Sequence, residues 1–276
     1  MPPAFWREPF LDMATSVWAM PEEFWIDDSP RFSDTDLLEK HAAAASAIDE
    51  GNFREAMLAK WKEGTDVNIH VRELPGRTRV VFLGTEQQWS EIPWAFWSRI
   101  FQAVDHPIGH VLLYADPRPR VDPAGNRELE AGDINGGYSY ICKQELVVIY
   151  RFEEATRVLL HELLHTLCFD SEKGVEDCEA HTEAWTELFL CALLSRGSQI
   201  KFNKLWKQQV DWMAEQAASL QVERNVNTPK DYAWRYMLGK KAVLEEKGFL
   251  RGFVSETTNG TSSLRFTTPL WDTYMT

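Results

Sequence analysis

The sequence predicts an α+β fold in which a strand-rich segment is followed by a run of long helices. Apolar, β-branched runs of strand length fall between residues 77 and 150. Beyond residue 150, apolar residues recur at helical spacing over much longer stretches. With 276 residues, of which 44% are hydrophobic, the chain is long enough to bury a large core.

The N-terminal part is predicted to differ from the rest of the chain. Residues 1–30 form a Trp- and Pro-rich arm, and residues 34–63 carry alanine-rich helical signals that break at Gly51. We therefore expect an N-terminal arm and helical region over residues 1–65. Residues 66–276, including the C-terminal helices, are expected to form one compact unit.

Strands and one helix are predicted in the middle of the chain. The run "RTRVVFLG" at 77–84 and the run "GHVLLYAD" at 109–116 have strand composition. Between them, "PWAFWSRIFQAV" at 93–104 suits a helix that begins with proline. A Pro- and Gly-rich loop is expected at 117–137, and one or two strands at 137–150.

The second half of the chain is predicted to be helical. The apolar stretch between Tyr150 and Asp170 reads as one helix that directly follows the last strand. Three further helices are expected at about 175–195, 198–225 and 229–246, with a Thr/Ser-rich tail after them. The place where the sheet gives way to helices is therefore close to residue 150.

Charge and hydropathy exclude two classes of partner. The net charge is −13, and a strongly acidic chain is not attracted to nucleic-acid phosphates or to an anionic lipid surface. No uninterrupted apolar stretch is long enough to span a bilayer. We therefore expect neither nucleic acid nor membrane as a partner.

The N-terminus and the cysteines suggest a cytoplasmic or nuclear setting. Charged residues interrupt the first apolar patches before a signal-peptide core of adequate length can form. None of the four cysteines belongs to a C-x-x-C pair, so we expect reduced thiols. The cysteines are Cys142, Cys168, Cys178 and Cys191.

The helical stretch after residue 150 contains the pattern H-E-x-x-H. His161 and His165 lie four residues apart, so both imidazoles share one helical face and can reach a single ion. Glu162 is displaced around the helix and can hold a water molecule. The neighbours in "VLLHELLHTL" are apolar, so these side chains are expected to face the core. A buried carboxylate beside two imidazoles needs compensation, which a divalent cation supplies.

A catalytic zinc ion usually has three protein ligands, and the segment "DCEAHTEAWTELFLCALL" at 177–194 offers candidates for the third. Glu179, Glu183 and Glu187 follow one another at four-residue spacing on one expected helix. His181 is offset by about 200° from Glu179 on that helix, so we expect it to lie outside the cluster.

Together, "HELLH" and "TEAWTELF" resemble the gluzincin metallopeptidases, in which a glutamate on a second helix follows H-E-x-x-H. The resemblance covers roughly residues 134–194 and implies a zincin-like small mixed sheet packed on the H-E-x-x-H helix. It also implies Zn²⁺ held by His161, His165 and Glu183, since Glu183 lies 18 positions after His165. Glu179, at 14 positions, is the alternative ligand, and Glu187 falls where the family keeps an acid that orients a histidine.

The same resemblance implies the chemistry. Glu162 acts as general base in the hydrolysis of a peptide bond, with a peptide or protein as substrate. Tyr236 is a candidate donor to the oxyanion by its downstream position. The extended substrate is expected along the strand before the helix, within residues 134–149. The small chain without an export signal is similar in this respect to intracellular tyrosine-carboxypeptidase-like enzymes.

Alternative kinds of metal site are tested by spacing. A metzincin needs a further histidine soon after His165, and "TLCFDSEKG" has none. A di-iron bundle needs two Glu-x-x-His elements, and the sequence offers Glu162 to His165 alone. A structural or catalytically inactive zinc protein remains the alternative. Such a site would close its fourth position with Cys or His, and Cys168 is the nearby thiol.

Overall fold

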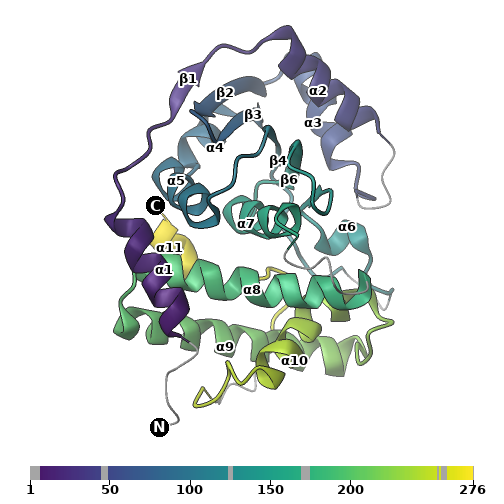
Figure 1. The fold of residues 1–276 in the computed structure, drawn as a ribbon. Helices are drawn as coiled ribbons and strands as arrows, with labels where there is room; N and C mark the ends of the chain where they lie inside the picture. The colour runs from purple at the N-terminus through teal and green to yellow at the C-terminus, as the bar shows by residue number, and fades with distance from the viewer. Residues whose placement is uncertain are drawn as a thin grey trace. The chain divides into compact units, whose positions relative to one another are not determined.

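The chain forms two compact units (Figure 1). The computed structural model describes residues 7–44, 49–123, 127–168, 175–253, 255 and 260–275. The sheet unit comprises residues 22–119 and 135–169, and the helical unit comprises residues 1–21, 120–134 and 170–276. Each unit is thus assembled from segments far apart in the sequence. The boundary expected after residue 65 falls inside the sheet unit.

A six-stranded mixed sheet forms the centre of the sheet unit. Its strands are β1 (Ile26–Asp28), β2 (Asn68–Leu74), β3 (Thr78–Gly84), β4 (His110–Asp116), β5 (Gly137–Ser139) and β6 (Leu146–Arg151). They lie in the order β1-β2-β3-β4-β6-β5. Strands β3, β4 and β6 are parallel, whereas β1, β2 and β5 run antiparallel to their neighbours. The expected α+β class, with a mixed sheet, is confirmed.

The three parallel strands are buried along almost their whole length, which their near-continuous apolar sequences reflect. In the register of the sheet, Val81 lies beside Leu112, and Leu112 beside Val148. On this face Leu38 of α2 (Phe32–Ala43) and Met57 of α3 (Phe53–Lys62) join the same buried cluster. Helices α2 and α3 therefore cover one side of the parallel strands.

Helices α4 (Glu86–Glu91), α5 (Trp94–Val104) and α7 (Ala155–Thr166) complete the sheet unit. Helix α7 packs against β5, β6 and α5. The indole Nε1 of Trp97 donates to Thr156 Oγ1 at 2.8 Å, which ties α5 to the first turn of α7. The helix expected at 93–104 is confirmed, with Pro93 as its N-cap residue.

The helical unit is organised around one long helix, α8. Its elements are α1 (Glu8–Ala19), α6 (Ala131–Ile134), α8 (Val175–Ser195), α9 (Gln199–Glu223), the π-helical turn η1 (Trp234–Leu238), α10 (Gly239–Glu246), the 3₁₀ turn η2 (Pro269–Trp271) and α11 (Asp272–Met275). Helix α8 packs against α1, α9, η1 and α10. In the described part of the chain, no helix is long and apolar enough to cross a membrane.

Several local expectations need correction. The predicted N-terminal arm contains α1, which begins at Glu8, has a proline in its first turn and buries Phe10, Ala14 and Val17 at helical spacing. Strands β1 and β2 were not predicted. The last expected helix contains a π-helical turn at its start, before α10.

The expectation of four reduced thiols is wrong for Cys142 and Cys168, which form a disulfide across 26 residues. The bond joins the loop after β5 to the residues just beyond the C-terminus of α7. Cys178 and Cys191 are buried free thiols. Burial raises the pKa of the Cys191 thiol well above its ordinary value, and the nearby Glu187 carboxylate adds to this effect.

Candidate metal centre

Helix α7 carries the H-E-x-x-H pattern directly after the last strand of the sheet. The chain leaves β6 at Arg151, turns through Glu154 in a left-handed conformation (φ 60°), and begins the helix at Ala155. Every residue of α7 is buried. The apolar neighbours of the two histidines thus place the pattern in the interior, as the sequence predicted.

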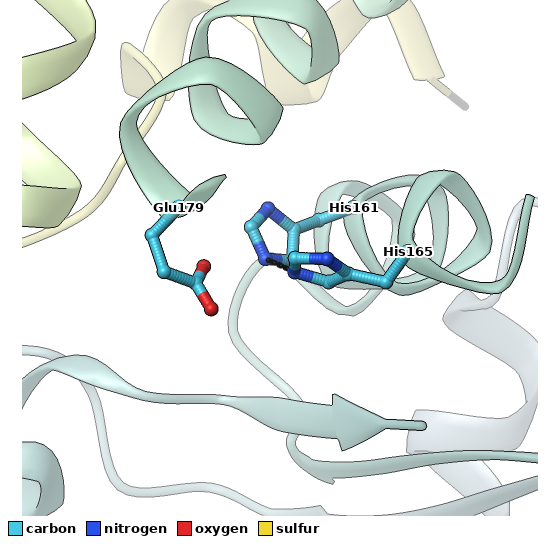
Figure 2. A group of neighbouring side chains, drawn as sticks. All are labelled: His161, His165 and Glu179. Atoms are coloured by element: carbon cyan, nitrogen blue, oxygen red, sulfur yellow. Dashed lines mark hydrogen bonds between the residues drawn. The ribbon is translucent and has the colours of Figure 1, made fainter. Parts of the chain in front are cut away.

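The imidazoles of His161 and His165 meet one helical turn apart. Their Nε2 atoms are 2.9 Å apart, and their rings are nearly perpendicular, at 81°. Figure 2 shows the two rings converging at these nitrogens. Two imidazole nitrogens that bind one zinc ion, each at 2.0–2.1 Å, are separated by about 3.3 Å. The observed separation is about 0.4 Å shorter than this and equals that of a hydrogen bond between the two rings, so a small movement of the rings would let both nitrogens share one ion. Each side chain is only 6% exposed.

The carboxylate of Glu162 is held by the edge strand β5. Ser139 Oγ donates to Glu162 Oε2 at 2.8 Å and lies 3.1 Å from the main-chain oxygen of the same residue. Glu162 is 5% exposed. A buried carboxylate costs free energy unless hydrogen bonds compensate it, and the Ser139 hydroxyl supplies one of them.

The acidic candidates lie on α8 of the helical unit. Glu183 and Glu187 are fully buried, whereas Glu179 is partly exposed. Figure 2 draws the side chains of His161, His165 and Glu179. The expectation that His181 lies outside the cluster stays a prediction. The assignment of Glu183 as third ligand stays a prediction, with Glu179 as its alternative.

Glu187 takes part in a buried ion pair of the helical unit. Its Oε1 accepts from Lys240 Nζ at 2.5 Å, and both side chains are fully buried. The same ammonium group also donates to the main-chain oxygen of Phe266 at 2.9 Å. This lysine on α10 was not foreseen from the sequence. The predicted role of Glu187 in orienting a histidine is not tested by this contact.

Tyr236 lies in the π-helical turn η1. Its hydroxyl accepts from Tyr232 at 3.3 Å, and its ring packs edge-on against Phe266 in an apolar cluster of the helical unit. The ring contacts show a packing role. The predicted donation to an oxyanion stays a prediction.

Two contacts near the H-E-x-x-H pattern were not predicted from the sequence. Ser139 contacts Glu162, and the Cys142–Cys168 disulfide lies beside His165. The main-chain nitrogens of both cysteines donate to the His165 carbonyl oxygen, at 3.0 and 3.1 Å. The only sequence signal for Ser139 was its place in the strand expected before the helix.

Comparisons with known proteins give no relative from which a function could be transferred. No protein-family model, no curated protein and no solved structure matches the chain. The functional argument therefore rests on the residues of this chain.

Proposed function

We propose that this protein is a zinc-dependent metallopeptidase that hydrolyses peptide bonds in a peptide or protein substrate. His161 and His165 hold the ion together with an acid of α8, for which Glu183 is the first choice and Glu179 the second. Glu162 is the general base. The observation that carries the proposal is the buried pair of imidazoles with Nε2 atoms 2.9 Å apart.

The chemistry follows from the position of Glu162 beside the histidine pair. A bound zinc ion supplies a Lewis acid that lowers the pKa of water and polarises a carbonyl group. The Glu162 carboxylate accepts a proton from the attacking water and later delivers it to the nitrogen of the leaving amine. Tyr236 is proposed as a donor to the developing oxyanion.

The substrate is proposed to bind in extended form along β5. This strand lies at the end of the sheet order, and in the described chain β6 is the strand that pairs with it. An extended peptide can add to such an edge through main-chain hydrogen bonds. A structure with a bound peptide should show backbone pairing within residues 134–149, and a peptide bound elsewhere would contradict this part of the proposal.

A structural zinc site is the competing interpretation. Such a site would close its fourth position with a further Cys or His ligand. Cys168, the thiol nearest in sequence to the histidines, is bonded to Cys142. The presence of Glu162 next to the histidines also favours catalysis, because a structural site does not require a general base.

The test compares wild-type protein with Glu162→Gln after incubation with a cell lysate. New peptide termini are identified by mass spectrometry. General-base catalysis is worth about 10²–10⁴ in rate, so termini produced by the wild type should nearly vanish with the variant. The variant should still bind zinc, because glutamine removes the base and leaves both histidines in place. Identical terminus profiles for the two proteins would overturn the peptidase proposal.

A further inference from the structure

The edge strand β5 approaches the general base through two residues on one face. Gly137 and Ser139 are two positions apart in the strand, so both point to the same side of the sheet. Ser139 Oγ is 2.8 Å from Glu162 Oε2. A Cβ atom at Gly137 would lie 3.4 Å from Glu162 Oε1. The two positions therefore flank the same carboxylate.

Gly137 allows this close approach. A Cβ at this position would be only 2.6 Å from Val158 Cγ1 on α7 and 2.7 Å from the main-chain oxygen of Val148 on β6. The main-chain oxygen cannot move without disturbing the sheet. A residue with a side chain would therefore push β5 away from α7, and with it the Ser139 hydroxyl.

The opposite face of β5 is anchored by Tyr138. Its hydroxyl lies 2.9 Å from His41 Nδ1 and accepts from Arg54 Nη1 at 3.0 Å. Arg54 is itself buried and paired with Asp49 at 2.8 Å. Burial raises the pKa of the Tyr138 hydroxyl, with the Arg54 charge opposing the rise, so the group stays a neutral phenol. These contacts fix β5 from the side away from α7.

We propose that Ser139 is a positioning residue that holds the Glu162 carboxylate in the orientation needed for proton transfer. The inference rests on the proposed function of Glu162 as general base. The Ser139 hydroxyl fixes one carboxylate oxygen, while Gly137 keeps the space beside the other. The anchored Tyr138 keeps both groups in register with α7. A carboxylate held in this way loses less conformational freedom when the reaction begins.

The test compares Ser139→Ala with Ser139→Thr in the zinc-loaded full chain. The substrate is a peptide that contains a cleavage site found in the wild-type terminus profile. For Ser139→Ala we expect kcat to fall about 10- to 100-fold with KM changed less than about twofold, because a hydrogen bond to a charged group is lost. Threonine keeps the hydroxyl and suits a strand, so Ser139→Thr should restore kcat to within about threefold of wild type.

Ser98→Ala is the matched control. Ser98 also lies in the sheet unit and is fully buried, whereas Ser139 is partly exposed, and the Ser98 hydroxyl donates to the main-chain oxygens of Glu23 and Trp94. Loss of the Ser98 hydroxyl should leave kcat unchanged, at a cost in stability equal to or greater than that of Ser139→Ala. A kcat for Ser139→Ala within twofold of wild type, or an equal loss in the alanine and threonine variants, would overturn the positioning role.

Crystal structures of wild type and Ser139→Ala give a readout that does not need turnover. We expect the Glu162 carboxylate to leave its position in the variant while the rings of His161 and His165 stay in place. An unmoved carboxylate would overturn the inference. If the wild type cleaves no peptide, the proposed function fails, and this structural comparison still decides whether Ser139 holds Glu162.

Discussion

Replacing both His161 and His165 by alanine is expected to remove the bound zinc and, with it, all zinc-dependent hydrolysis. Purified wild-type protein should contain about one zinc ion per chain. A single glutamate cannot retain the ion, because catalytic zinc sites use three protein ligands. Metal content measured by mass spectrometry after gel filtration checks this result. Zinc retained at the wild-type level by the double variant would exclude the histidine pair as ligands.

His181→Ala is the control for this experiment. His181 is a partly exposed histidine of α8 that we expect to lie outside the zinc site. Its replacement should leave the zinc content unchanged. The separate variants Glu183→Ala and Glu179→Ala then identify the third ligand, since the true ligand is the one whose loss lowers zinc affinity. Our assignment predicts that Glu183→Ala has the larger effect.

Reduction of the Cys142–Cys168 disulfide is expected to destabilise the protein by about 3.5 kcal/mol, if the bond acts by restricting the unfolded chain over a 26-residue loop. Both cysteines are exposed, so a reductant can reach them. Thermal unfolding should shift down by roughly 5–10 °C on addition of the reductant. The bond closes the chain segment that contains β6 and α7, so this segment should lose protection from hydrogen exchange first.

The double variant Cys142→Ser/Cys168→Ser separates this effect from other thiol chemistry. Its melting temperature should match that of the reduced wild type and should not respond to the reductant. The buried thiols Cys178 and Cys191 stay present in both proteins. A wild-type melting curve that the reductant leaves unchanged would contradict a stabilising role for the disulfide.

The parts of the fold that the sequence predicted are those with local patterns. Strands β3, β4 and β6 are buried runs of apolar residues, and helices α5, α8 and α9 have long apolar periodicities. Strand β1 has no such pattern, because its sequence is "IDD". It is held by long-range contacts of its aspartates, with Asp27 paired to Arg72 and Asp28 to Arg79. No local sequence pattern predicts these ion pairs.

In the candidate site, too, the sequence predicts contacts within one helix but not contacts between distant segments. The H-E-x-x-H residues lie on one helix, so their four-residue spacing alone predicts that the imidazoles meet. Helical periodicity alone cannot choose the third ligand, because Glu179 and Glu183 occupy the same helical stripe one turn apart. The contact of Ser139 with Glu162 and the bond between Cys142 and Cys168 depend on how the chain returns after β6. Such contacts between distant segments need the tertiary structure.

We propose that His161 and His165 hold a zinc ion in an open catalytic site. X-ray absorption at the zinc edge of the zinc-loaded wild type tests it most directly. An open catalytic site should show nitrogen and oxygen neighbours alone, at about 2.0–2.2 Å, including two imidazoles and a carboxylate. The imidazole signal should disappear in the variant without both histidines. A sulfur neighbour at about 2.3 Å, or four protein ligands around the ion, would exclude an open catalytic site and favour a structural zinc site.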